Sequence, residues 1–144
     1  MNWTLEVVLV PVADVDRAKD FYATRCGFTV DLDTEVVPGM RIVQITPPGS
    51  RCSITLQSGM PLAEGETAMA PGSLQGLQLC VTDIEAAREQ LVSRGVEVSP
   101  VQHAGPSGWA EGKGEDTWNA FMFFKDPDGN GWTVQEAPSE LSER

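Results

Sequence analysis

An internal repeat is the feature that most limits the folds open to this chain. Val12–Ala18 and Val81–Ala87 align without a gap, and each leads into a helical stretch that closes at a glycine, Gly27 or Gly95. Each copy follows an apolar run typical of a strand and places an aspartate where helix N-caps prefer one. The chain is therefore expected to contain the same supersecondary unit twice.

The first copy is predicted to form a strand, a helix and three further strands. The apolar run over residues 5–12 is typical of a strand buried on both faces. Asp14 then suits the N-cap of a helix. The three later strands are expected at residues 28–32, 40–45 and 52–57. Residues 58–73 are rich in Gly, Pro, Ala and Glu without periodicity, so they are interpreted as a connector.

The second copy repeats this order from residue 74. A strand is predicted over residues 74–81, and Asp83 suits the N-cap of the following helix. Another strand is expected over residues 96–101, and the glycine-rich segment 104–117 is long enough to be a lid.

The second copy ends in a predicted β-hairpin whose strands contain Phe121, Phe123 and Thr133. The turn between them is Asp126–Asn130, in which proline presets φ and Gly129 can adopt the left-handed conformation. The modules are thus expected at residues 3–57 and 74–137, within one domain over residues 1–144 that ends in a polar tail, 138–144.

Composition excludes several classes of protein. The chain has 144 residues, 41% of them hydrophobic and 22% charged, as in ordinary soluble domains. No apolar run approaches the roughly 20 residues of a membrane span, so a membrane partner is not expected and the protein is predicted to be cytoplasmic. The formal net charge of −11 opposes binding to nucleic acid. Three cysteines without paired spacing, Cys26, Cys52 and Cys80, are interpreted as buried reduced thiols.

The repeated segments and the hairpin turn resemble the vicinal oxygen chelate superfamily, which includes glyoxalase I, bleomycin-resistance proteins, extradiol dioxygenases and fosfomycin-resistance enzymes. The matching segments span nearly the whole chain: Val12–Tyr22, Cys26–Phe28, Val81–Ala87, Arg94–Val96 and Phe124–Asn130. This resemblance implies an α+β fold of two βαβββ modules that form a cup-shaped mixed sheet, as in the glyoxalase/bleomycin-resistance fold. It also implies a homodimer and a ligand cavity in the cup.

The resemblance argues against the usual metal site. The positions that hold a metal in other members fall on Val7, Gly76 and Thr133, and the fourth strand offers only Ser53, Thr55 and Gln57 at inward positions. The expectation is therefore no metal and no cofactor. One alternative stays open: Glu6 and Glu136 lie near ligand positions, although alternation directs each to the other face of its strand. If the strand registers differ by one, these two could bind a divalent ion with His103.

Candidate functional residues follow from side-chain chemistry. His103 is the candidate catalytic base, since histidine titrates near neutrality. Trp109 and Trp118 are expected on the lid, where large rigid side chains could cover an aromatic ligand. The remaining candidate ligand-binding residues occupy alternating strand positions: Thr55, Gln57, Phe121, Phe123, Thr133 and Gln135.

Two functions are compatible with these residues. The preferred hypothesis is a metal-free protein that binds a hydrophobic or aromatic small molecule in an apolar cavity, as the bleomycin-resistance proteins that it resembles bind their drug. The alternative is an isomerase, lyase or cyclase that uses His103 or a loop carboxylate as base, without a metal or with an atypical divalent site.

Overall fold

The computed structural model of the chain describes residues 1–138. The predicted polar tail therefore lies outside the described residues, except for Pro138. The chain divides into two compact units. Unit 1 comprises Met1–Leu74 and the short segment Asp126–Asn130, and unit 2 comprises Gln75–Lys125 and the chain from Gly131 onward. No helix within residues 1–138 is long and apolar enough to cross a membrane.

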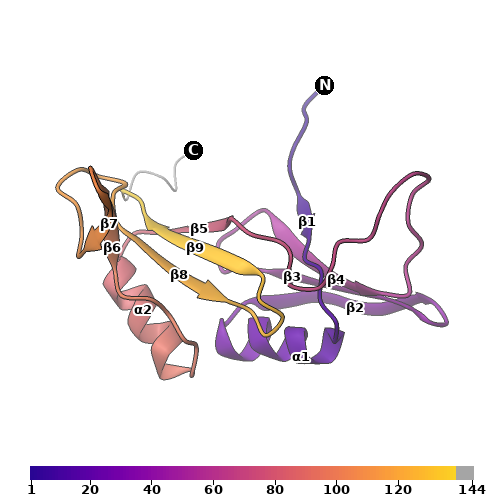
Figure 1. The fold of residues 1–144 in the computed structure, drawn as a ribbon. Coiled ribbons are helices and arrows are strands. Elements are labelled where there is room, and N and C mark those ends of the chain that lie inside the picture. The colour runs from indigo at the N-terminus through magenta and orange to yellow at the C-terminus, as the bar shows by residue number, and fades with distance from the viewer. Residues whose placement is uncertain (139–144) are drawn as a thin grey trace. The chain divides into compact units, whose positions relative to one another are not determined.

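Unit 1 is a four-stranded mixed sheet with one helical segment (Figure 1). Its elements are β1 (Val7–Leu9), α1 (Val15–Asp20), the π-helical turn η1 (Phe21–Arg25), β2 (Thr29–Val37), β3 (Met40–Thr46) and β4 (Ser53–Ser58). The strand order is β1-β4-β3-β2, with β1 parallel to β4 and the other pairs antiparallel. This is the predicted strand-helix-three-strand order, although β2 is longer than expected.

Alternation along the strands gives the unit 1 sheet two different faces. Ile45 and Ile54 are paired and buried, as are Val43 and Leu56, and α1 packs against β4 on that side. The opposite side, here called the far face of unit 1, carries Ser53 and its strand neighbours at even spacing. Asp14 caps α1 by accepting a 3.1 Å hydrogen bond from the backbone N–H of Arg17, as the sequence predicts.

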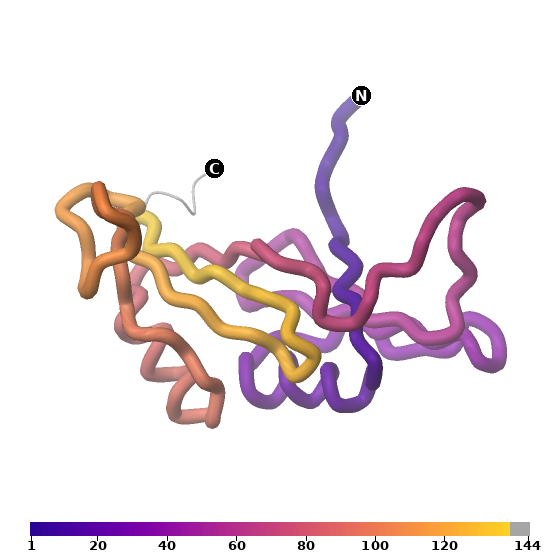
Figure 2. The backbone as a smooth tube through the Cα atoms, viewed as in Figure 1, coloured from indigo at the N-terminus to yellow at the C-terminus, as the bar shows by residue number. Residues whose placement is uncertain are grey.

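Strand β1 differs from the prediction. The apolar run was expected to be buried on both faces over residues 5–12, but β1 covers only Val7–Leu9 and lies at the sheet edge. Val7 and Leu9 are each 41% exposed, and the residues before them extend away from the sheet of unit 1 (Figure 2). Val7 and Leu9 pair with Ser53 and Thr55, so their side chains lie on the far face of unit 1, on the side of the sheet away from α1.

Unit 2 is a five-stranded sheet with one helix. Its elements are β5 (Leu77–Val81), α2 (Ile84–Ser93), β6 (Gln102–Gly105), β7 (Gly108–Glu111), β8 (Phe121–Lys125) and β9 (Gly131–Glu136). The order is β5-β9-β8-β6-β7, with β5 parallel to β9. Met122, Phe124, Trp132 and Val134 form the buried side of the β8-β9 hairpin, and α2 packs on these strands.

Two expectations for unit 2 were wrong. The strand predicted over residues 96–101 is absent apart from an isolated bridge between Val98 and Phe124, and regular pairing begins only at Gln102. The segment 104–117, expected as a lid loop, instead begins in the β6-β7 hairpin. A high content of glycine and proline is common to long loops and to the tight turns of hairpins, so the composition of this segment did not distinguish between them.

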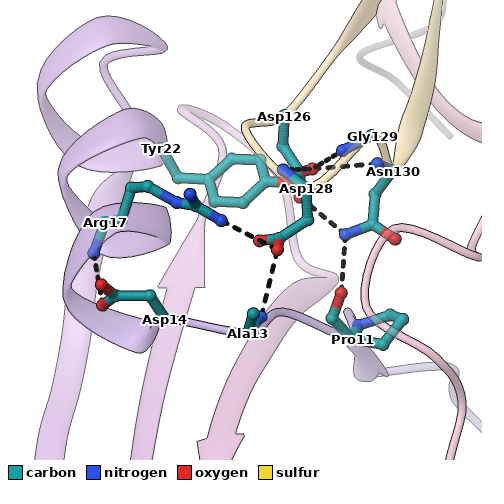
Figure 3. A network of polar contacts seen from close by, with 9 residues as sticks. All are labelled: Pro11, Ala13, Asp14, Arg17, Tyr22, Asp126, Asp128, Gly129 and Asn130. Atoms are coloured by element: carbon teal, nitrogen blue, oxygen red, sulfur yellow. Dashed lines mark hydrogen bonds and ion pairs between the residues drawn. The ribbon is translucent and has the colours of Figure 1, made fainter.

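The turn between β8 and β9 belongs to unit 1, although both strands belong to unit 2. Asp126 organises this turn, since its Oδ1 accepts hydrogen bonds from the backbone N–H groups of Asp128, Gly129 and Asn130 at 2.9–3.0 Å (Figure 3). The Asn130 side chain donates to the Pro11 carbonyl at 2.8 Å and accepts from the Leu74 N–H at 3.1 Å. The turn is thus fixed by polar contacts within unit 1.

Candidate functional site: the aromatic face of unit 2

Three aromatic rings gather on the face of the unit 2 sheet opposite α2. The Trp109 ring lies edge-on to Phe121 and Phe123, with ring centroids 5.1 and 5.2 Å apart and interplanar angles of 66° and 71°. Trp109 is 53% exposed, whereas both phenylalanines are half-buried. This surface, which also carries Thr133 and Gln135, is called the aromatic face below.

The strand register explains why these residues meet. Phe121 pairs with Gln135 and Phe123 pairs with Thr133, so the four side chains lie on one face. Their neighbours along the strands, among them Trp132 and Val134, point to the buried side. The sequence left the orientation of the phenylalanine pair open, and the pairing of β8 with β9 decides it.

Gln135 links the aromatic face to the segment that carries Trp118. Its Nε2 donates to the Trp118 carbonyl at 2.7 Å, and its Oε1 accepts from Gln78 Nε2. Trp118 has φ of 73°, the only positive value among non-glycine residues of the described chain. A bulky residue in this conformation is uncommon and requires support from its surroundings, which the Gln135 amide provides here.

The β6-β7 hairpin that presents Trp109 is held by Asn119. The Asn119 amide accepts from the Ala104 N–H at 2.8 Å and donates to the Ala104 carbonyl at 3.1 Å. Ala104 is the strand partner of Trp109. Asn119 therefore bonds β6 on the side that faces β8, beyond the end of that strand, in the way a longer β8 would.

His103 is not brought to the aromatic face. Its neighbour Gln102 pairs with Phe121, so alternation directs His103 to the other side of the sheet. There its Nδ1 lies 2.9 Å from the Gly112 carbonyl oxygen. An imidazole nitrogen next to a carbonyl carries the hydrogen and donates it, so this nitrogen is engaged in holding the chain.

Thr55 and Gln57 lie on the far face of unit 1. Thr55 pairs with both Leu9 and Gln44, and its hydroxyl is buried without a hydrogen-bond partner among the described residues. Gln57 borders a groove of about 220 Å³ that is otherwise lined mainly by the connector and by the residues that follow β1. These two candidates belong to a different unit from the aromatic face.

The residues at the family's metal-binding positions do not fit a metal. Val7 and Gly76 have no ligating atom, and Thr133 offers a single hydroxyl. Within residues 1–138, no group of three or more His, Cys, Asp or Glu side chains is arranged to hold an ion.

Glu136, a member of the alternative ligand set, has other partners within unit 2. Glu136 turns to the helix side, where its carboxylate accepts from the Ile84 N–H at 3.0 Å and pairs with Lys113 at 3.0 Å. The hydrogen bond from Lys113 to this carboxylate raises the lysine pKa. Glu136 therefore serves as a partner for the α2 N-terminus.

Each unit begins with a strand and a helix and continues with further strands, and the usual ligand positions hold Val7, Gly76 and Thr133. These features indicate the family of the chain. The chain belongs to the Glyoxalase/Bleomycin resistance protein/Dioxygenase superfamily, whose profile matches residues 4–134. Its fold is the α+β fold of that superfamily, which confirms the family and the fold class inferred from the repeat.

Several solved structures resemble the chain closely. TnmS3, an antibiotic binding protein from Streptomyces sp. CB03234, is 31% identical, with a TM-score of 0.70 over 94% of this chain and 97% of that chain. A glyoxalase/bleomycin resistance protein from the same organism is 32% identical, with a TM-score of 0.68 over 92% and 99%. A superfamily member from Sphaerobacter thermophilus DSM 20745 is 29% identical, with a TM-score of 0.69 over 94% and 98%. No similar sequence was found among curated proteins.

Proposed function

We propose that this protein binds a flat aromatic or hydrophobic small molecule on its aromatic face, without a metal and without converting it. The observation that carries this proposal is the half-exposed indole of Trp109, fixed edge-on against Phe121 and Phe123. Aromatic side chains held in place by packing offer a large apolar contact area at low entropic cost. Thr133 supplies a hydroxyl beside them.

The comparison with TnmS3 supports the same class of ligand. That protein binds an antibiotic, and the present chain shares 31% of its residues and nearly its whole length. An aromatic antibiotic or a metabolite of similar shape is therefore the ligand class we propose. Binding of this kind needs shape and apolar contact rather than a reactive group.

We also propose that the protein acts in the cytoplasm as a homodimer. Cys26, Cys52 and Cys80 are all free thiols, as expected in a reducing compartment. Trp3, Leu5, Val7 and Leu9 alternate along the N-terminal segment and are 89%, 76%, 41% and 41% exposed, respectively. A row of exposed apolar side chains that continues an edge strand is suited to pairing with a second copy.

The binding proposal can be tested with purified protein, elemental analysis and tryptophan fluorescence against a panel of aromatic antibiotics and planar aromatic compounds. We expect saturable quenching with no product formed and no stoichiometric metal. Trp109→Ala should weaken binding about tenfold, and Trp109→Phe should retain most of it. Val92→Ala, an exposed apolar site on α2, serves as the matched control.

Other results would contradict the proposal. Turnover of a bound compound, lost in His103→Ala, would favour the enzymatic alternative. Equal affinities of the wild-type protein and Trp109→Ala would remove the aromatic face from the binding site. A tightly held metal ion in purified protein would contradict the metal-free mode of binding.

A further inference from the structure

Residues 113–118 form a short irregular loop between β7 and β8, and both residues that flank it are anchored. The Gly112 carbonyl oxygen lies 2.9 Å from His103 Nδ1, and the Asn119 amide bonds both backbone groups of Ala104. His103 and Ala104 are consecutive residues of β6. The segment, called the 113–118 loop below, is thus attached to one strand at both ends, so a change of its shape is confined to the residues between.

Two consecutive residues at the end of β9 hold the 113–118 loop. On the aromatic face, Gln135 Nε2 donates to the Trp118 carbonyl at 2.7 Å. On the α2 side, Glu136 Oε2 lies 3.0 Å from Lys113 Nζ. Successive side chains of a strand point to opposite faces, so these two contacts fix the loop to both faces of the same strand end.

A backbone hydrogen bond inside this region couples the two contacts. The Gly114 N–H donates to the Asn119 carbonyl at 2.8 Å, and these residues follow Lys113 and Trp118 directly in the sequence. The approach is close, since a Cβ atom on Gly114 would lie 2.7 Å from Asn119 Nδ2. Movement of Lys113 away from β9 therefore pulls on the Gly114 hydrogen bond and, through Asn119, on the backbone of Trp118.

The backbone of Trp118 is strained in this arrangement. Its φ of 73° is the only positive value among the non-glycine residues of the described chain. In the left-handed region the Cβ atom crowds the backbone, which bulky side chains tolerate poorly. Such a conformation persists only while its surroundings hold it. The strain at Trp118 therefore favours release of the loop, and the contacts with β9 oppose it.

The ion pair of Lys113 with Glu136 is the contact that conditions can break. The two side chains are 39% and 25% exposed, so water and salt screen the pair in part. Glu136 Oε2 also accepts from the Ile84 N–H at 3.0 Å, which keeps the carboxylate in place when the lysine leaves. The hydrogen bond to Glu136, together with the charges of Glu85 and Asp83, raises the Lys113 pKa, so the ammonium group stays charged.

We propose that the 113–118 loop is a latch with two positions. In the closed position, which the structure shows, Lys113 pairs with Glu136 and Trp118 is held in the left-handed conformation. Loss of the ion pair opens the loop, and the backbone of Trp118 then relaxes. Opening also frees the Gln135 amide on the aromatic face. Only this last consequence rests on the proposed function, because the latch itself is a property of the free protein.

Amide exchange of Gly114, measured by NMR without any ligand, tests the ion pair. This N–H is protected by its bond to Asn119 in the closed position, so its exchange rate follows the open population. Lys113→Met keeps an unbranched side chain and removes the charge, so exchange should be about threefold faster. A rise from about 0.01 to about 1 M NaCl should accelerate exchange in the wild-type protein but not in Lys113→Met.

Lys125→Met is the matched control. Lys125 is exposed on β8 and takes part in none of the ion pairs found within residues 1–138. This variant loses the same charge from the same unit, so it should leave both the Gly114 exchange rate and its salt dependence unchanged.

A pair of variants tests the strain at Trp118. Both Trp118→Asn and Trp118→Val remove the indole ring, but asparagine adopts the left-handed conformation readily and the β-branched valine does not. Exchange of the Gly114 amide should therefore be about tenfold slower in Trp118→Asn than in Trp118→Val. The Gln135 side-chain amide signals should follow the same order, since their partner is the Trp118 carbonyl.

Three results would overturn the latch. The first is equal Gly114 exchange in the wild-type protein and Lys113→Met, and the second is equal exchange in the two Trp118 variants. The third is an acceleration that the amides of β8 share, because it would indicate a general loss of stability. None of these results touches the proposed ligand binding, and a failure to bind any aromatic compound would leave the latch standing.

Discussion

The Tyr22 hydroxyl donates a 2.7 Å hydrogen bond to Asp126 Oδ2, across 104 positions of the sequence. Tyr22 is fully buried and Asp126 is 5% exposed, so this charge-assisted bond is shielded from water. The same oxygen accepts from Asn130 Nδ2 at 2.7 Å. The Asp126 carboxylate thus fixes the β8-β9 turn and also accepts a hydrogen bond from the π-helical turn η1 (Figure 3). The bond to η1 explains why the β8-β9 turn belongs to unit 1.

Removal of this hydroxyl should destabilise the protein. Tyr22→Phe leaves the ring in place and deletes one buried hydrogen bond to a charged group, which should cost about 1.5–3 kcal/mol of unfolding free energy. Urea or thermal unfolding measures the change. Arg17→Met serves as the control, because Arg17 also bonds this turn, through Asp128 at 2.9 Å, but its side chain is 51% exposed. That exposed pair should contribute less than about 1 kcal/mol.

A double-mutant cycle of Tyr22→Phe with Asp126→Asn then tests whether the two residues act together. A coupling energy of about 1 kcal/mol or more is expected for residues in direct contact. Strictly additive effects would show that the hydrogen bond contributes nothing beyond the packing of each side chain.

An ion-pair network on the helix side of unit 1 should make stability depend on pH. Arg41 donates to both carboxylate oxygens of Asp33 at 2.9 and 3.0 Å and to Asp16 at 2.8 Å, and Lys19 adds a 2.7 Å contact to Asp33. The hydrogen bond from Arg41, followed by that from Lys19, holds the Asp33 pKa far below its ordinary value. The Asp33 and Arg41 side chains are 26% and 24% exposed, so water still screens the pair in part.

The sign of the pH effect follows from this lowered pKa. The Asp33 contribution is fully present above the pKa that aspartate has in the unfolded chain, about 3.9, and is lost as pH falls from there toward the folded-state pKa. The stability difference between the wild-type protein and Asp33→Asn should be about 1 kcal/mol at pH 7 and should shrink below about pH 4. Denaturant unfolding across this range measures it. A difference that stays constant down to pH 3 would contradict the prediction.

Much of the fold could be predicted because its signals are local. Asp14 and Asp83 cap helices that begin where the repeat places them, and Asp126–Asn130 forms the expected turn. The failures concern contacts between distant segments. Nothing local shows that β1 lies at an edge, or that residues 102–111 pair as a hairpin rather than form a loop. Cys80 was expected to be buried but is exposed, since its strand position faces away from α2.

The candidate site was predictable in kind but not in arrangement. Alternation within each strand groups Phe121 with Phe123 and Thr133 with Gln135, but only the pairing of β8 with β9 brings the two groups to one face. The placement of Trp109 depends on a hairpin that the sequence did not reveal. Asn119 was missed, because it acts through backbone groups that only the fold brings near it.

Asn119 provides a test of how the aromatic face is positioned. Asn119→Ala removes both hydrogen bonds to Ala104 and should cost about 1–2 kcal/mol of stability. Because Ala104 pairs with Trp109, the hairpin should also loosen, so amide exchange in residues 102–111 should accelerate and ligand affinity should fall. Thr117→Ala, an exposed site in the same segment, is the control. Unchanged exchange in this hairpin would show that Asn119 does not hold it.

The N-terminal segment provides a test of the proposed homodimer. Leu5 is 76% exposed and lies in the alternating apolar row before β1. Leu5→Asp would place an unpaired charge in the interface, so the dimer dissociation constant should rise at least about tenfold. The monomer should fold normally, because Leu5 lies outside the buried core of unit 1. Light scattering after size-exclusion chromatography measures the change in mass.

Leu62→Asp is the matched control for this variant, since Leu62 is 54% exposed on the connector and lies outside the alternating row. It introduces the same charge at a comparable apolar site, so any general effect on solubility or charge should appear in both variants. We expect Leu62→Asp to retain the wild-type mass at concentrations where Leu5→Asp is monomeric. A wild-type protein that is already monomeric at high concentration would contradict the homodimer, and equal dissociation of both variants would exclude the N-terminal row as its interface.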